Sequence, residues 1–277
     1  MFEKALTLSE QLQKDDPAFD PSRFITVQCD AALHHMQRGK YVPAAERLNT
    51  VRLFVGSLYE LDKVYCGIAQ CLFYRDIGFT KRVRETLELL KGSQTFKTSF
   101  FSVEHTLLDA RMPDVTDQEK GLRLERALEI TEQLGTLYQR CQVLNELAGV
   151  HISIGEKQKA QEYSNSALQL ARKQGYKLLE VRALLQSGIA SEKQKGKEHR
   201  LLGAFQGASE MGLEELAAES AFHLGMLHLE MGNLVTAREY LSRSVSTTAK
   251  LSEEIPIRCR TNYLAVSWRR DARHGRT

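Results

Sequence analysis

The sequence predicts an all-α protein, a right-handed α-solenoid of stacked antiparallel helix hairpins. Three observations support this fold class. Small residues recur with a nearly constant step along the chain, from Ala32 to Ala265. Leucines around them are spaced by three and four residues, as on a helix with one buried face. Only five prolines occur in 277 residues, so long uninterrupted helices are permitted.

Each repeat is predicted to be one helical hairpin built around a small central residue. The central residues are at positions 32, 71, 110, 148, 188, 225 and 265, which gives steps of 39, 39, 38, 40, 37 and 40. In the clearest copies a glycine follows after seven residues and an alanine after twelve, as in Ala148, Gly155 and Ala160. The small residues let two helices approach closely, and the glycine supplies the left-handed backbone that ends the first helix. Because one hairpin cannot bury its apolar face alone, the repeats are expected to stack.

The first elements are a half-repeat and a break. Residues 1–14 match the second helix of a hairpin that has no first helix before it. The stretch from Asp15 to Pro21 interrupts the pattern, and about six helix pairs follow over residues 22–252.

The later elements are less regular. The pattern is weakest over residues 90–125, where Met112-Pro113-Asp114 interrupts it, and a basic segment from Lys193 to Arg200 replaces one of the usual turns. Residues 257–271 match a first helix, so we expect a final half-repeat or a capping helix there. We therefore predict a single solenoid over residues 1–277, and its incomplete end repeats favour a segment of a larger protein.

Leu224-Gly225, followed by Gly232 and Ala237, resembles the tetratricopeptide repeat. The usual period of that family is about 34 residues, whereas the step here is nearer 40. The chain is therefore similar to the longer variant found in the helical sensor region of the maltose-regulon activator and in related bacterial signalling ATPases. The resemblance covers nearly the whole chain. It implies that the first helices of the repeats line a concave binding face.

The sequence carries no motif of a catalytic site. It has no Gly-x-x-x-x-Gly-Lys-Ser/Thr phosphate loop, no Gly-x-Gly-x-x-Gly turn and no Gly-x-Ser-x-Gly elbow. His35, His151 and His228 each follow a central residue by three positions, which favours a packed ring over a metal ligand. Five scattered cysteines without a Cys-x-x-Cys pair indicate free thiols. We expect no enzyme, no cofactor and no metal site.

Charge and hydropathy argue against nucleic-acid binding, secretion and membrane insertion. A formal net charge of +3 is too small to indicate nucleic acid, and the basic run after Lys193 has no interleaved aromatic residues. The chain has no signal-peptide pattern and no apolar stretch of about 18 residues. We expect a cytoplasmic protein without a membrane partner.

The candidate binding residues lie on the first helices, near the central small residues. They mix aromatic and apolar side chains with Arg and Asn, which suits an extended peptide or a helix held in a groove. Partner contacts are expected from six residues: Tyr65, Arg75, Asn145, Arg182, Phe222 and Met226.

The leading hypothesis is a non-catalytic interaction or regulatory solenoid, a segment of a larger signalling or transcription-regulatory protein. It would bind a partner protein, a peptide or a small effector in its concave groove. The alternative is a stand-alone peptide receptor. A nucleic-acid-binding repeat protein and an enzyme are less favoured. Exposed solenoid ends also predict dimerisation through those ends.

Overall fold

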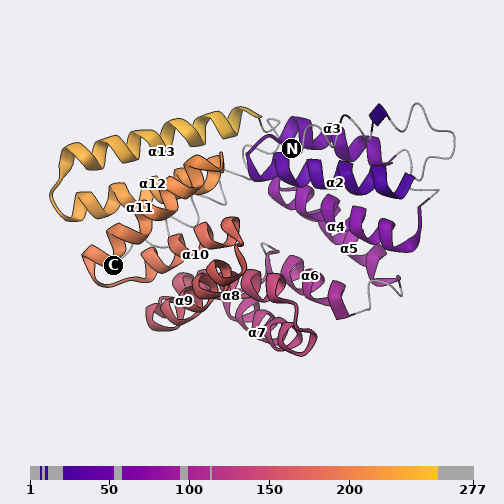
Figure 1. Ribbon diagram of the computed structural model, residues 1–277, viewed down its shortest axis with the longest axis horizontal. Coiled ribbons are helices and arrows are strands. Elements are labelled where there is room, and N and C mark those ends of the chain that lie inside the picture. The colour runs from indigo at the N-terminus through magenta and orange to yellow at the C-terminus, as the bar shows by residue number, and fades with distance from the viewer. Residues whose placement is uncertain are drawn as a thin grey trace. The chain divides into compact units, whose positions relative to one another are not determined.

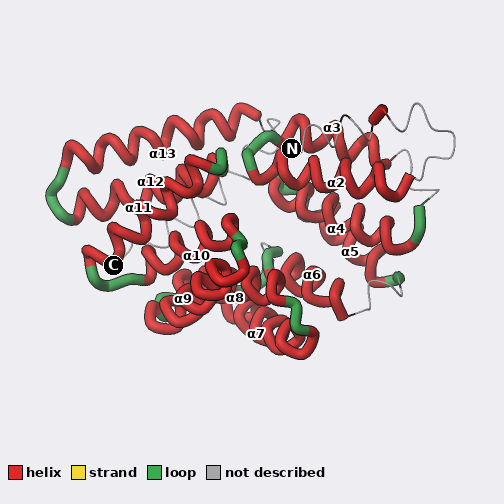
Figure 2. The backbone as a smooth tube through the Cα atoms, viewed as in Figure 1, coloured by secondary structure: helices red, strands yellow, loops and turns green. Residues whose placement is uncertain are grey.

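A computed structural model describes residues 7, 10, 11, 21–52, 58–93, 99–112 and 114–254. Within these residues all regular secondary structure is helical, and the helices follow one another as hairpins (Figure 1; Figure 2). The first helices of the hairpins are α2 (Pro21–Gln37), α4 (Glu60–Asp76), α6 (Ser99–Ala110), α8 (Leu137–Ser153), α10 (Lys177–Ala190) and α12 (Glu214–Glu230). The second helices are α3 (Tyr41–Arg52), α5 (Thr80–Lys91), α7 (Asp117–Leu134), α9 (Lys157–Gln174), α11 (Gln194–Glu210) and α13 (Leu234–Glu254).

The helices group into two compact units. Among the described residues, unit 1 contains α2 to α5, the start of α6 up to Ser102, and Glu254. Unit 2 runs from Val103 to Glu253 and contains most of α6 together with α7 to α13. Each unit has its own buried apolar core.

In unit 1, α2 packs against α3 and α4, and α4 packs against α5. Phe24 and Ile25 of α2 are almost completely buried in this core. Gly67 brings α4 close to α5, because a Cβ at this position would lie 2.7 Å from Leu90 Cδ2. A side chain at position 67 would therefore force the two helices or Leu90 to move.

In unit 2, each helix from α7 to α12 packs against the next. One core cluster joins α6, α7 and α8 through Leu107, Leu124 and Leu147. Another joins α10, α11 and α12 and includes Leu185 and Leu224. Because each cluster spans three successive helices, burying one hairpin's apolar face requires the next hairpin.

The turns within hairpins use the glycines that the repeat pattern predicts. Gly155 ends α8 with a φ of 84°. Around it the Glu156 amide donates to the His151 carbonyl at 2.9 Å, and the Gly155 amide donates to the Ile152 carbonyl at 3.1 Å. This pattern uses helix-end carbonyls that would otherwise lack donors, and it requires the left-handed backbone that glycine adopts without strain.

The start of α7 shows a different solution, because proline and aspartate interrupt the repeat there. Thr116 is the N-cap of α7, and its hydroxyl accepts from the Glu119 amide at 3.3 Å. The Glu119 carboxylate accepts in return from the Thr116 amide at 3.1 Å, which completes a capping box. Local side-chain chemistry thus begins α7 without the usual glycine turn.

The small central residues allow close contact between the helices of a hairpin, as predicted. A Cβ on Gly188 would lie 2.8 Å from Leu201 Cγ of α11, and one on Gly225 would lie 2.6 Å from Leu241 Cγ of α13. Ala148 and Ala160 are fully buried in the hairpin of α8 and α9.

The predicted fold class is confirmed, since the described helices form a helical-repeat array. The predicted helix over residues 257–271, and residues 1–14 apart from positions 7, 10 and 11, lie outside the described residues. The extent of a single solenoid over the whole chain stays a prediction. None of the described helices is long and apolar enough to cross a membrane.

Candidate functional site

The candidate site is the face of unit 2 formed by its first helices, which we call the first-helix face. Its side chains stand six, three or two residues before, or one or four residues after, a central small residue. We define it by Glu104 and Arg111 near α6, Gln142 and Glu146 on α8, Arg182 and Ile189 on α10, and Phe222, Met226 and Leu229 on α12.

A chain of three charged side chains crosses this face. Arg111 Nη2 lies 2.6 Å from Glu146 Oε1, and Arg182 Nη1 lies 3.9 Å from the same oxygen. One carboxylate oxygen thus faces two guanidinium groups from neighbouring repeats. Arg182 keeps 40% of its side chain exposed, so its guanidinium can take a further anionic group.

Two buried polar atoms on this face have no hydrogen-bond partner among the described residues. They are Nε of Arg182 and Oε1 of Gln142, one a donor on α10 and the other an acceptor on α8. Buried polar groups are normally paired, because an unpaired one loses its hydration without compensation.

The α6 end of the face holds a half-buried carboxyl, that of Glu104. Burial raises the pKa of Glu104, and the opposite charge of Arg111 and a hydrogen bond with Gln139 partly offset this shift. Tyr138 lies nearby and packs edge-to-face on Tyr176, with ring centroids 5.2 Å apart. Burial also raises the pKa of the Tyr138 phenol, and the charge of Glu104 adds to that rise.

The α12 end of the face is apolar and open. Met226 is 37% exposed and Leu229 is 46% exposed. Phe222, one turn before Met226, is half-buried and packs edge-to-face on His223 at 5.3 Å between centroids. Exposed apolar side chains about one turn apart on a helix suit a ligand that presents apolar side chains of its own.

Asn145 lies in the interior. It is 5% exposed, and its Nδ2 donates to the Cys141 carbonyl of α8 and to the Leu179 carbonyl of α10, both at 3.2 Å. This amide joins two successive first helices, so its place in the structure is that of an inter-repeat link. A direct contact between Asn145 and a partner stays a prediction, and the burial of Asn145 does not support it.

The two candidate residues of unit 1 have local partners. Tyr65 donates a hydrogen bond to Asp30 of the neighbouring first helix, and burial followed by this bond raises the pKa of its phenol. Arg75 Nε lies 2.7 Å from Asp76 Oδ1. Arg182, Phe222 and Met226 belong to unit 2, whereas Tyr65 and Arg75 belong to unit 1.

The histidines after the central residues are packing residues, as the sequence predicts. His151 stacks on Tyr163 with centroids 5.2 Å apart, and His228 stacks on Tyr240 at 5.8 Å, so the two hairpins repeat the same contact. The described part of the chain contains no group of three or more side chains placed to hold a metal ion.

Sequence reasoning missed Glu104, Arg111 and Glu146. Glu104 stands six residues before Ala110, the same offset that selected Tyr65 and Arg182. The signal was therefore present, but the repeat around Ala110 was the weakest of the series. Glu146 was missed because its two partners, Arg111 and Arg182, belong to the preceding and the following repeat.

The chain is similar in fold to several solved structures, although its sequence matches no known family. No protein-family model and no curated protein sequence matches the chain. Among solved structures, a Rap protein in complex with competence and sporulation factor is 14% identical with a TM-score of 0.70, over 97% of this chain and 82% of that chain. NprR in complex with its cognate peptide NprX is 13% identical with a TM-score of 0.60, over 95% and 85%.

A third similar structure contains a tetratricopeptide repeat sensor. It is a signal-transduction ATPase of the STAND type with a tetratricopeptide repeat sensor, from Pyrococcus horikoshii. This chain matches it at 14% identity and a TM-score of 0.59, over 98% of this chain and 42% of that one. These likenesses show that the chain has a tetratricopeptide-like helical-repeat fold.

Proposed function

We propose that this protein is a non-catalytic regulator that binds a linear peptide along the first-helix face of unit 2. The observation that carries the proposal is that first helices of unit 2 expose apolar side chains, Met226 and Leu229 on α12, and a guanidinium, Arg182 on α10. Two of the similar structures, the Rap protein and NprR, were solved with a factor or peptide bound. Their folds support the proposal.

The chemistry of the face suggests how the peptide is held. The exposed part of the Arg182 guanidinium pairs with a carboxylate of the peptide. Met226 and Leu229 contact apolar side chains, since they are exposed in the free protein.

We also propose a repeat type and a location for this protein. The repeats are of the longer type found in sensor regions of bacterial signalling ATPases, because the step between central residues stays near 40. A cytoplasmic location is supported by the free thiols of Cys29, Cys66, Cys71 and Cys141.

The test is selection of binders from a random heptapeptide library displayed on phage, followed by fluorescence anisotropy with the enriched peptides. The double variant Arg182→Ala, Met226→Ala should bind them at least about tenfold more weakly than the wild type. The matched control is Arg126→Ala, Leu122→Ala on α7, which also removes one exposed arginine and one exposed apolar side chain.

Equal affinities for the wild type and the first-helix variant would contradict the proposal. The same holds if the α7 control loses as much affinity, because the loss would then report stability and not contact. Circular dichroism of each variant checks that the helices are retained.

A further inference from the structure

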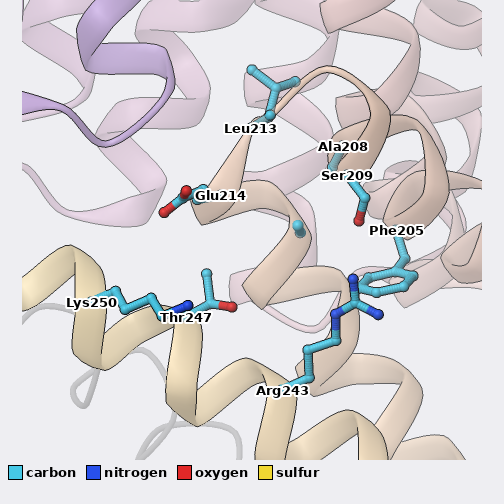
Figure 3. A pocket seen from close by; sticks show the side chains of 10 residues that line it. Phe205, Ala208, Ser209, Leu213, Glu214, Arg243, Thr247 and Lys250 are labelled. Atoms are coloured by element: carbon cyan, nitrogen blue, oxygen red, sulfur yellow. The ribbon is translucent and has the colours of Figure 1, made fainter.

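A pocket opens between α11, the start of α12 and α13, away from the residues that define the first-helix face. Its volume is about 210 Å³. Small residues, Ala208 and Ala217, line it where larger side chains would fill it. Figure 3 shows the side chains that surround it, with Phe205 and Ser209 from α11 and Arg243, Thr247 and Lys250 from α13.

Two cations of α13 line the pocket. The Arg243 guanidinium carbon lies 4.6 Å from the centroid of the Phe205 ring, a cation–π contact (Figure 3). Lys250 stands seven residues later, and Thr247 lies between them on the same face of the helix. Within the described ranges, neither Arg243 nor Lys250 forms an ion pair.

The electrostatic balance of the pocket is positive. Its charged lining residues are Arg243, Lys250 and Glu214. Glu214 is the first residue of α12 and is exposed at the rim, without an ion pair to either cation. The lining therefore carries two cations against one carboxylate, and both cations retain N–H donors for an anion.

We propose that this pocket binds a small organic dicarboxylate, with one carboxylate on Arg243 and the other on Lys250. The Arg243 guanidinium binds one carboxylate through two N–H groups, a geometry that Arg provides and Lys does not. The Lys250 ammonium pairs with the second carboxylate as a point charge. The Thr247 and Ser209 hydroxyls donate further hydrogen bonds to the carboxylate oxygens.

The size of the pocket sets the size of the ligand. The pocket volume of about 210 Å³ is below the range of about 300–1,000 Å³ that is typical of sites for drug-sized ligands, so it suits a four- or five-carbon diacid and is too small for a nucleotide. Along α13 the Cα atoms of Arg243 and Lys250 are about 10 Å apart, as seven residues of helix require. Two long, flexible cationic side chains can close this distance onto the two ends of such a diacid.

This site would be a second ligand site and does not depend on the peptide site. None of its lining residues belongs to the first-helix face. The ligand would bridge α13 to α11 and the start of α12, so its binding would stabilise the last described hairpin against its neighbour.

The test is isothermal titration of the full chain with succinate at constant ionic strength. Saturable binding is expected below about 20 mM. Arg243→Gln and Lys250→Gln should each weaken binding at least about tenfold, and so should Thr247→Leu, which keeps both charges and fills the space between them. Arg238→Gln is the matched control, because Arg238 is exposed on α13 outside the pocket and should leave the affinity unchanged.

Comparison ligands decide the chemical class. Acetate should bind at least about tenfold more weakly than succinate, because it lacks the second carboxylate. Three results would overturn the proposal: no saturable succinate binding to the wild type, equal losses in the Arg243 and Arg238 variants, or tighter binding of inorganic phosphate than of succinate. Far-ultraviolet circular dichroism confirms that each variant keeps its helices.

Discussion

Gly225 provides the sharpest test of how the hairpins hold together. It lies in α12 close to α13, and the change to alanine adds one methyl group. The new Cβ would lie 2.6 Å from Leu241 Cγ, 2.8 Å from Leu241 Cδ2 and 3.2 Å from the Ala237 carbonyl oxygen. One obstacle is the branch point of a side chain and another is backbone, so rotating the end of a side chain cannot relieve both.

Two opposing effects set the magnitude. Alanine in place of glycine favours a helix interior by about 1 kcal/mol. Overpacking of a close helix contact costs about 1–3 kcal/mol, and distances well below van der Waals contact place Gly225→Ala near the upper end. We expect the free energy of unfolding to fall by about 1–2 kcal/mol.

The matched control is Gly203→Ala in the middle of α11. Its Cβ would lie 3.6 Å from Leu184 Cδ1, an ordinary contact. Only the helix-propensity gain remains, so Gly203→Ala should raise the free energy of unfolding by about 0.5–1 kcal/mol. Urea unfolding followed by circular dichroism measures both. If Gly225→Ala proves as stabilising as Gly203→Ala, the close approach of α12 and α13 does not require glycine, and the reasoning is refuted.

Three further predictions concern local chemistry. Thr116→Ala removes the hydroxyl of the capping box at the start of α7, so urea unfolding should show a loss of about 1 kcal/mol, and an unchanged midpoint would contradict the cap's role. Because the folded-state pKa of Glu104 is raised, the stability that this carboxyl contributes is present at low pH and is lost as the pH rises through that pKa. The stability of Glu104→Gln relative to the wild type should therefore increase between about pH 4 and pH 7, and a flat or falling difference would show that Arg111 outweighs burial. Burial raises the pKa of Cys71 to about 12 and that of Cys141 to about 11. With the cysteine beyond the described residues changed to serine, the native protein should therefore react with a thiol reagent at pH 8 far more slowly than the urea-unfolded chain, and fast native reaction would show that these thiols are accessible.

Features that act within one hairpin could be predicted from the amino-acid sequence. A glycine such as Gly155 ends a helix because of its own backbone freedom, and its position after Ala148 can be read from spacing alone. The packing histidines were predictable for the same reason, since His151 and Tyr163 stand in one hairpin and lie against each other. Local rules of this kind need no knowledge of the neighbouring repeat.

The tertiary structure decided which side chains of different hairpins meet. Asn145 shares its offset from the central residue with Phe222, yet Asn145 is buried against Leu179 of the next repeat and Phe222 remains half-exposed. Glu146 attracts two arginines from the repeats on either side of it, which no spacing within its own helix reveals.

The grouping into two units and the pocket beside Arg243 also arise from contacts between hairpins. A repeat fixes the direction of each side chain relative to its own helix. How closely successive hairpins approach, and whether a buried polar atom finds its partner there, depends on the size and charge of residues about 35 to 40 positions away. That is the physical reason why the fold could be predicted from the sequence and the details of the site could not.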